Sequence, residues 1–505
     1  MNARASIASE STNAVTTRIG PAVRHIGPTR LTRGLDLHDR IDRAAHERIH
    51  GRLSPLSTDQ LINLATAGLL CGRGGAGFPF ARKVQAVADA AVRRGSRTVV
   101  VVNGTEGEPG SAKDKVLLTR APHLVLDGAV LAATALGSQE IVVGVTDDRA
   151  AASIEQAIAE RDLAARARMV RLPERFITGE SGALIRGING DRPVPPGRKQ
   201  RAYDSGVGGL PTLLSNAETF AQLAVLASLG PRAYRDVGIP AEPGTVLLTV
   251  AGSARFPAVV EIPTGAPLAH LLDLCGANAG DGVLVGGYHG AWLSREAAML
   301  AEVSRESLTK AGGILGAGVI MPIGRRTCPL GECARVAHYL AAESAGQCGP
   351  CKLGLADIAG ALSGLAAGQD GSAALEALRR AAQLVRGRGA CHHPDGTARF
   401  VLSAIDTFAA DVADHLTRGT CGRPVLGLLP VGTEAGAAIH LEVDWSRCEA
   451  HGLCADILRG FVRTDPHGYP LLPREPISAH LEQDARRAVA QCPSLALRLR
   501  RPQGT

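Results

Sequence analysis

The chain is poor in aromatic residues and in long apolar runs. Phenylalanine, tryptophan and tyrosine make up 3% of its 505 residues, which argues against a surface that stacks nucleic-acid bases. No uninterrupted apolar stretch reaches about 18 residues, so the sequence predicts no membrane span of its own. The net charge of +7 then favours phosphate groups or an acidic protein partner over nucleic acid.

Cysteine is almost missing from the first two thirds of the chain. Of the eleven cysteines, only Cys71 and Cys275 precede residue 328. The first residues lack the apolar core of a secretory signal, and we predict a flexible or partner-binding tail over residues 1–50. Clustered cysteines without a secretory signal favour bound metal over a disulfide framework, which predicts a reducing, cytoplasmic location.

The stretch Cys71–Lys83 is the densest glycine segment, with Gly72, Gly74, Gly75 and Gly77 within six residues. A backbone without Cβ atoms can lie against a flat or anionic ligand, and Arg73 and Lys83 add positive charge. The spacing matches the dinucleotide fingerprint by letter, but that fingerprint follows a strand, whereas residues 57–70 predict a capped helix. The sequence therefore predicts a phosphate-binding loop outside an ordinary Rossmann context; a glycine-rich surface turn is the alternative.

Strand and helix patterns alternate after this loop. Strands are expected at residues 97–102, 140–145 and 169–172, and helices at 121–136 and from 149 onward. Open α/β sheets bind ligands at the carboxyl ends of their strands. Asn103, Glu106 and Glu108 follow the first of these strands. Gly179 and Glu180 open a predicted helix at the same edge, where its first turn offers free amides, and residues 211–219 predict a polar turn that carries Asn216 and Thr219.

The second half of the chain divides into smaller units. Short strands at 245–251, 258–262 and 282–285 with a helix at 268–275 predict a β-grasp unit. Residues 328–418 predict helices at 333–345, 353–365, 373–386 and 402–415. The expected domains are therefore 51–240, 241–326, 327–418 and, after a Gly/Pro-rich linker at 419–436, 437–505.

Two groups of cysteines have the spacing of metal ligands. Cys348 and Cys351 are three residues apart and Cys391 follows forty residues later, which is typical of an iron–sulfur site. Zinc with His392 or His393 as a further ligand, and plainly buried cysteines, are the alternatives.

The second group, Cys448, Cys454 and the Cys492-Pro493 pair, is typical of single-cluster ferredoxins. Three thiolates suit a [3Fe-4S] cluster. Ligation by His451, which occupies the middle position of the motif, would complete a [4Fe-4S] cluster; a bystander histidine is the alternative.

In order along residues 50–418, these motifs resemble the NADH- and FMN-binding (51 kDa, F-type) subunit of respiratory complex I and its soluble relatives. The segments that carry the resemblance are Gly72–Pro79, Asn103–Gly110, Gly179–Glu180, Pro211–Thr219 and Glu343–Cys351. The last domain separately resembles actinobacterial-type single-cluster ferredoxins. The resemblance implies a Rossmann-like α/β FMN domain, a β-grasp (SLBB) domain, a helical bundle with a [4Fe-4S] or [3Fe-4S] cluster, and a small α+β ferredoxin domain.

The resemblance also assigns individual residues. It implies FMN contacts from Gly72, Gly74, Lys83, Asn103, Glu106, Gly179, Glu180, Asn216 and Thr219. It directs Phe78 and Glu108 toward the nicotinamide nucleotide.

Several positions depart from the family pattern. Thr105 replaces an aspartate, and Ser181 replaces a second glutamate that faces the adenosine ribose and repels a 2′-phosphate. Stacking or charged side chains are lost at Val84, Val194 and Gly197. Ala345 replaces the first cluster cysteine, which leaves three ligands unless Cys328 or Cys333 folds back or a water or partner group completes the site.

The sequence therefore predicts an oxidoreductase that passes electrons from NAD(P)H through FMN and the bundle cluster to the fused ferredoxin and then to a redox partner, soluble or membrane-bound. A flavin is required because a hydride carries two electrons and a cluster accepts one. No acid–base catalytic side chain is expected. A thioredoxin-like iron–sulfur subunit is the partner that the family implies. The alternative is an electron-transfer or adaptor subunit with a degenerate nucleotide site, reduced by another redox protein.

Overall fold

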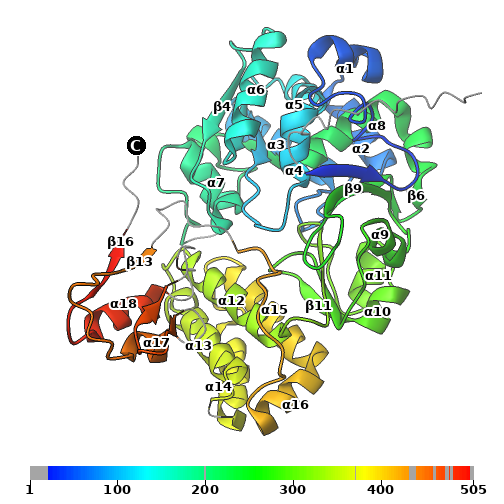
Figure 1. The fold of residues 1–505 in the computed structure, drawn as a ribbon. Helices are drawn as coiled ribbons and strands as arrows, with labels where there is room; N and C mark the ends of the chain where they lie inside the picture. Colours follow the sequence, from blue (N-terminus) through cyan, green and yellow to red (C-terminus); the bar gives the residue numbers. More distant parts are fainter. Residues whose placement is uncertain are drawn as a thin grey trace, which may run out of the picture.

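The computed structural model describes residues 21–197, 201–369, 371–431, 440–458, 462–472, 477 and 482–500. Four units follow one another along the chain, from the blue and cyan α/β unit through a green mixed sheet and a yellow helical bundle to a red C-terminal module (Figure 1).

The α/β unit is built on a parallel four-stranded sheet in the order β4-β3-β2-β5. The strands are β2 (Val99–Gly104), β3 (Glu140–Val145), β4 (Ala167–Arg171) and β5 (Thr212–Asn216). Four consecutive valines of β2 are buried, as expected for a strand covered on both faces. Because β3 and β4 lie on one side of β2 and β5 lies on the other, the strand order reverses between β2 and β5. Asn103 and Asn216 are partners at the carboxyl ends of these two strands, where such a reversal opens a crevice.

The prediction of a polar turn at residues 211–219 is wrong for its first half. Residues 212–216 form β5, and Leu213 is fully buried. Pro211 and the Ser215-Asn216 pair have the chemistry of a turn, but pairing with β2 along the whole segment overrides that local preference. Asn216 then caps helix α8 (Ala217–Arg235), because its side chain accepts the Thr219 amide.

Helices cover this sheet. Those that the sequence predicts are α2 (Thr58–Ala67), α5 (Pro122–Ala135), α6 (Asp148–Glu160) and α7 (Ser181–Ile188). Helices α3 (Phe80–Arg94) and α4 (Lys113–Arg120) were not predicted. A capping box of Ser57 and Gln60 begins α2. Therefore a helix, and not a strand, precedes the glycine loop, as predicted.

The prediction of a flexible tail is wrong for residues 22–50. Strand β1 (Ala22–His25) pairs in parallel with β9 (Ala258–Pro263), and α1 (Arg43–His50) follows. The buried carboxylate of Glu261 accepts hydrogen bonds from the backbone amides of residues 30–32. This long-range contact was not visible in the local composition. Residues 1–20 lie outside the described part.

The β-grasp unit contains a six-stranded sheet in the order β1-β9-β8-β12-β10-β11. Its further strands are β8 (Thr245–Val250), β10 (Gly282–Val285), β11 (Ala291–Ser294) and β12 (Val319–Ile323), with α9 (Leu268–Leu274), α10 (Arg295–Leu300) and α11 (Arg305–Lys310). The hairpin of β6 (Gly238–Ile239) and β7 (Glu242–Pro243) connects it to the α/β unit.

The bundle has five α-helices within its described residues. They are α12 (Pro329–Ala342), α13 (Leu355–Ala366), α14 (Gly371–Val385), α15 (His393–Thr407) and α16 (Ala409–Arg418). The helix predicted at 402–415 is therefore two helices, broken at Phe408. Helix α12 ends before Ala345, and a short π-helical turn (Pro350–Gly354) contains Cys351. Residues 424–429 of the predicted linker are docked, because the Glu332 carboxylate accepts the amides of Leu426 and Gly427 at 2.9 and 2.7 Å.

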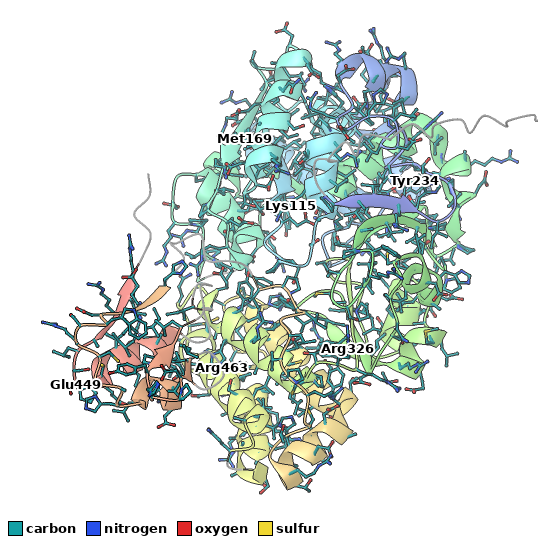
Figure 2. All side chains as sticks on the ribbon, in the orientation of Figure 1. Lys115, Met169, Tyr234, Arg326, Glu449 and Arg463 are labelled. Atoms are coloured by element: carbon teal, nitrogen blue, oxygen red, sulfur yellow. The ribbon has the colours of Figure 1, made fainter. Side chains whose placement is uncertain are left out.

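The C-terminal module has a small core of its own. It comprises β13 (His440–Val443), α17 (Leu453–Ile457), β14 (Arg463–Thr464), β15 (Pro470–Leu471), α18 (Glu482–Gln491) and β16 (Leu497–Arg500), with β13 and β16 antiparallel. The module lies beside α12 and α13 in Figure 1, and Glu449 lies on its outer side in Figure 2. Among the described helices, none is by itself long and apolar enough to cross a membrane; the pair α4 and α5, bent by 92°, passes on length and composition alone.

Candidate functional site

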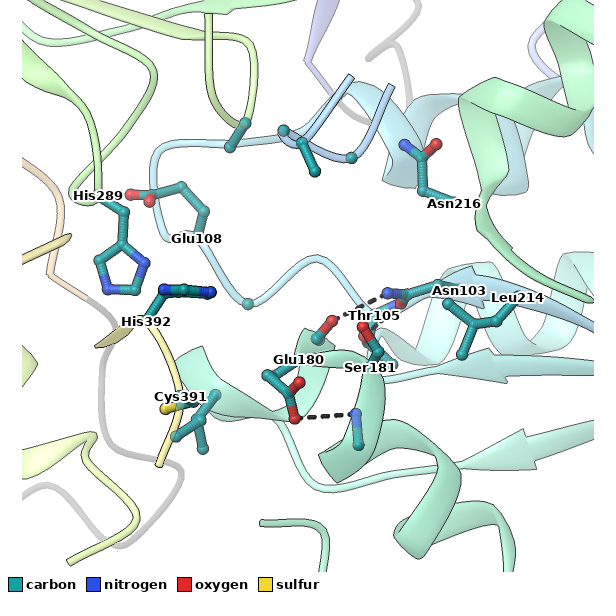
Figure 3. Close-up of a pocket in the computed structure, with 18 of the residues that line it drawn as sticks. Asn103, Thr105, Glu108, Glu180, Ser181, Leu214, Asn216, His289, Cys391 and His392 are labelled. Atoms are coloured by element: carbon teal, nitrogen blue, oxygen red, sulfur yellow. Dashed lines mark hydrogen bonds between the residues drawn. The ribbon is translucent and has the colours of Figure 1, made fainter. Parts of the chain in front are cut away.

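A cavity of about 860 Å³ opens at the reversal between β2 and β5. The glycine loop, the loop after β2, the start of α7 and the residues before α15 all contribute to its wall. Glu108, His289 and His392 line one side, and Asn103, Leu214 and Asn216 line the opposite side (Figure 3). The cavity thus joins the α/β unit, the β-grasp unit and the bundle.

The glycine loop forms a closed turn at this cavity. Cys71 and Pro79 form a β-bridge, and the Gly72 amide donates to the Phe78 carbonyl at 2.9 Å. Gly75 and Gly77 have φ values of +101° and +60°, which side-chain-bearing residues rarely adopt. The loop therefore keeps its backbone close to the cavity, with Gly74 and Gly75 in the wall.

The two cations of the loop have different surroundings. Arg73 is buried, and its guanidinium interacts with Tyr234 and Glu218, so part of its charge is compensated within the protein. Lys83 lines the cavity, and its Nζ donates to the Leu214 carbonyl at 3.0 Å. Partial burial lowers the pKa of Lys83, and no carboxylate in the described chain forms an ion pair with it. Of the two cations of the loop, Lys83 is therefore the better placed for an anionic ligand.

The loop after β2 is fixed to the start of α7. Asn103 Nδ2 donates to the Gly179 carbonyl at 3.0 Å, and Asn103 Oδ1 accepts from the Thr105 hydroxyl at 2.6 Å. The Glu180 carboxylate accepts the Gly182 and Ala183 amides, both at 2.9 Å. The expectation of free amides in this first turn is therefore wrong for these two groups, because Glu180 itself caps the helix.

Beneath the glycine loop, buried charges form a network that the sequence analysis missed. Lys113 Nζ lies 3.0 Å from Asp114 and 2.9 Å from Glu218, and Asn216 donates to Asp114. The Glu106 carboxylate accepts the Lys115 amide at 2.8 Å, and burial followed by the Asp114 charge raises its pKa. No local signal could have found this network, since α4 carries four charged residues among eight and looks like a solvated helix in the sequence.

Glu108 is the least compensated acid of the wall. Its Oε2 accepts the Tyr288 amide at 2.9 Å, whereas its Oε1 is buried and has no hydrogen-bond partner in the described structure. Burial is the main reason why the pKa of Glu108 rises to about 8. An unpaired oxygen that lines a cavity is suited to accept a hydrogen bond from a bound molecule.

A pair of neutral histidines lies beside Glu108. His393 Nε2 lies 2.8 Å from the Leu340 carbonyl, and its Nδ1 lies 2.9 Å from His289 Nε2. A carbonyl only accepts, so we assign the His393 proton to Nε2 and let Nδ1 accept from His289. Burial lowers the pKa of both rings. The next residues along the chain, Cys391 and His392, also line the cavity.

Cys391 belongs to the first predicted cysteine group, which the structure brings together. The thiols of Cys348, Cys351 and Cys391 interact with one another. Burial raises the pKa of Cys348, but main-chain donors of Ala390 and Cys351 outweigh this effect and lower it. Amide donors directed at thiolates fit an iron–sulfur site. Cys328 and Cys333 do not fold back to this group, because both are buried around α12, away from its C-terminal end.

The second cysteine group is also brought together. Cys448, His451, Cys454 and Cys492 line one small cavity of about 20 Å³, and Cys454 interacts with both other thiols. His451 is about two fifths exposed, and its Nε2 lies 3.7 Å from Glu449. The thiols fit a cluster, and His451 stays a predicted ligand.

Most of the predicted flavin and nucleotide residues lie in the large cavity. Those in its wall are Arg73, Gly74, Gly75, Lys83, Asn103, Glu106, Glu108, Gly179, Glu180 and Asn216. Gly72, Gly77, Phe78 and Thr219 lie behind or beside the wall, and Phe78 is 46% exposed. Among the departures from the family pattern, Thr105 and Ser181 are in the wall, whereas Val84 is buried in the core and Val194 lies outside the wall.

Comparison with known proteins gives matches along most of the chain. Residues 65–225 match the Nuo51 FMN-binding domain, residues 332–415 match the NADH-ubiquinone oxidoreductase-F iron-sulfur binding region, and residues 441–499 match a 4Fe-4S single cluster domain. Fold and site therefore define a flavo-iron–sulfur oxidoreductase whose cofactors are FMN and iron–sulfur clusters.

Within that class, the chain is similar to subunits of NADH-quinone oxidoreductases and to an NAD+-reducing hydrogenase. An F-type NADH-quinone oxidoreductase subunit of Rhizobium meliloti (strain 1021) is 28% identical over 389 residues, which are 73% of this chain and 91% of that protein. The F-type counterpart of Escherichia coli (strain K12) is 27% identical over 385 residues, 72% of this chain and 86% of that protein. A crystal structure of NAD+-reducing [NiFe]-hydrogenase in the air-oxidized state superposes with a TM-score of 0.68 at 26% identity, covering 79% of this chain and 68% of that one. The chain is an oxidoreductase module of the NADH dehydrogenase type, fused to a single-cluster ferredoxin domain, and it passes electrons through FMN and iron–sulfur clusters.

Proposed function

We propose that this chain takes electrons from NADH or NADPH at the large cavity and delivers them singly, through the Cys348–Cys351–Cys391 site, to its own ferredoxin module and then to a separate redox protein. FMN, when bound, supplies the exchange between a two-electron hydride donor and one-electron carriers. The observation that carries the proposal is that Cys391 lines the same cavity as the glycine loop. A cluster held by this cysteine is therefore adjacent to the flavin site.

The side chains around the cavity hold and orient the cofactor. Lys83 places a half-buried positive charge in the same cavity that the backbone of Gly74 and Gly75 lines, which suits a phosphate. Asn103 is held by Gly179 and Thr105, so its position is fixed before a ligand arrives. These residues need not move a proton, since hydride transfer requires no acid–base pair.

Contacts between units keep the cluster loop at the cavity. The Glu343 carboxylate accepts the Phe176 amide at 2.8 Å, and Gln347 donates to the Pro195 carbonyl at 3.2 Å. Both bonds join the segment before Cys348 to the α/β unit. We also propose that the chain is cytoplasmic and reaches the face of a membrane only through a partner. A thioredoxin-like iron–sulfur subunit is a further partner in this proposal.

The test is an anaerobic titration of the purified full chain with NADH and then with NADPH, following the flavin absorbance and the electron paramagnetic resonance of the clusters. We expect bleaching by at least one nucleotide, followed by the signals of reduced clusters. Bleaching by neither donor in large excess would instead support the adaptor function, in which another redox protein reduces the chain.

Lys83→Met tests the flavin site itself. We expect a loss of most of the FMN that co-purifies with the chain, because a phosphate bound at the glycine loop would lose the positive charge of Lys83. Lys310→Met is the matched control, since Lys310 is an exposed lysine that pairs with Glu306. Equal flavin content in both variants would remove Lys83 from the site.

A further inference from the structure

Cys328, His415 and Cys421 form a third group of metal-ligating side chains, separate from the cavity and from both iron–sulfur sites. Their ligand atoms all lie within 4.8 Å of one another. Cys328 Sγ lies 3.4 Å from His415 Nε2, and Cys328 and His415 are buried while Cys421 is partly exposed. This group is compact and shielded on most sides.

The three residues come from the two ends of the bundle. Cys328 caps the first turn of α12, where its Sγ accepts the Gly331 amide at 3.3 Å. His415 lies in the last turn of α16, and Cys421 follows Gly419, whose left-handed conformation ends that helix. The group therefore joins the entry and the exit of the bundle.

The spacing distinguishes a single ion from a cluster. Tetrahedral coordination with Zn–S distances of about 2.3 Å and Zn–N distances of about 2.0 Å separates a sulfur from a nitrogen ligand by roughly 3.5 Å. The separation of 3.4 Å between Cys328 Sγ and His415 Nε2 agrees with this value. The same nitrogen accepts the Cys421 amide at 3.2 Å, and binding of the ion would replace this hydrogen bond. An iron–sulfur cluster places several atoms between its cysteines and requires a wider arrangement.

We propose that Cys328, His415 and Cys421 bind one Zn²⁺ ion, with the fourth position taken by water at the partly exposed Cys421 side. Two thiolates and one imidazole are a ligand set that zinc prefers. Zinc has no redox chemistry, so the ion holds structure and carries no electrons. Arg423 bridges Asp281 and Asp411 and also interacts with the Cys421 thiol, so a cation already lies beside one of the two sulfur ligands and favours its thiolate form.

The ion would fix the segment that leads to the ferredoxin module. Cys328 N donates to the Pro424 carbonyl at 2.8 Å, and the Glu332 carboxylate accepts the amides of Leu426 and Gly427. The exit segment is thus attached to the start of α12 beyond the three ligands. A zinc ion bound by Cys421 would hold the start of this segment in place. It would therefore fix the position from which the chain continues to the ferredoxin module.

The experiment measures metal content per chain in the full-length protein purified anaerobically without chelator. We expect one zinc ion per wild-type chain and loss of most of it in Cys421→Ser and in His415→Ala, with FMN retained. Cys333→Ala is the matched control, because Cys333 is a buried cysteine of the same helix that does not belong to the group. X-ray absorption at the zinc edge should give two sulfur ligands and at least one nitrogen ligand.

Absence of zinc from the wild-type protein, zinc retained in both ligand variants, or a Cys328–Cys421 disulfide in the untreated protein would overturn the proposal. If the variants fail to fold, wild-type protein treated with a zinc chelator serves instead. Its hydrogen exchange should then increase at residues 419–431 while the FMN content stays constant. Unchanged exchange after zinc has been removed would exclude the structural role.

Discussion

Ser181 is the first residue of α7 and lines the cavity, but its side chain carries no charge. The family pattern has an acid here that repels a 2′-phosphate, so this chain lacks one barrier to NADPH. We predict that Ser181→Glu lowers kcat/KM for NADPH at least about ten-fold relative to NADH, because like charges brought together at a binding site cost more than about 1.4 kcal/mol.

The check is steady-state reduction of an artificial acceptor with each nucleotide. Ser181→Gln is the control, since it adds similar bulk without charge. A loss that is equal for both nucleotides would show that the position does not face the 2′-phosphate.

Glu108 supplies a prediction about pH. Because its folded-state pKa is about 8 against an ordinary value of 4.5, the native protein binds a proton that the unfolded chain has released between these values. Stability therefore falls as the pH rises through this window, by at most about 1.4 kcal/mol per pH unit. Glu108→Gln removes this titration, so its advantage in Tm over the wild type should grow from pH 5 to about pH 8.

Thermal unfolding of the two proteins at several pH values measures this difference. Glu302→Gln, a change at an exposed acid, should leave the pH profile unaltered. A Tm difference that does not depend on pH would mean that Glu108 is ionised in the native protein throughout.

At the scale of elements, local sequence patterns predicted the helices and strands that depend on neighbouring residues. The valines of β2 and the capped start of α2 at Ser57 lie within a few residues of the structure that they specify, and both were predicted. Strands β1 and β5 were missed because their stability comes from partners more than a hundred residues away. Asn103 and Asn216 were predicted as residues of the cavity from the sequence. Lys113 and His289 were not, because their place in the wall depends on which loops come together there.

The attachment of the N-terminal segment can be tested at Glu261. Its carboxylate is fully buried and accepts the amides of Arg30, Leu31 and Thr32 and the hydroxyl of Thr245. Glu261→Ala leaves these donors unpaired, and at about 1–3 kcal/mol for each buried group we expect a loss of at least about 3 kcal/mol.

Denaturant unfolding measures the loss of overall stability, and limited proteolysis measures the release of the N-terminal segment. We expect a lower unfolding midpoint and new cleavage between residues 22 and 50. Glu302→Ala, an exposed acid of the same unit, is the control. Unchanged protease resistance would show that β1 is held by its strand pairing alone.

At the scale of the whole molecule, the order of the units along the chain matches the order of the proposed electron path. The cavity lies between the first three units, Cys391 forms part of its wall, and the ferredoxin module packs beside the bundle (Figure 1). Loss of the bundle cluster should therefore leave reduction of the flavin intact and stop reduction of the ferredoxin module. The FMN site and the cluster site of the module should both remain in place.

Cys391→Ser makes this separation. We predict that NADH or NADPH, whichever reduces the wild-type flavin, still bleaches the flavin of the variant at a similar rate, because Lys83, Asn103 and the glycine loop are unchanged. Reduction of the ferredoxin-module cluster, followed by freeze-quench electron paramagnetic resonance, should slow by more than about ten-fold, which corresponds to more than about 1.4 kcal/mol on the barrier.

Cys275→Ala controls for the loss of a buried cysteine elsewhere. Cys454→Ser provides the complementary case, in which the bundle cluster is reduced and the module is not. If the module of Cys391→Ser is reduced at the wild-type rate after its bundle cluster is lost, electrons reach the ferredoxin by another route, and the adjacency of Cys391 to the cavity has no part in the transfer.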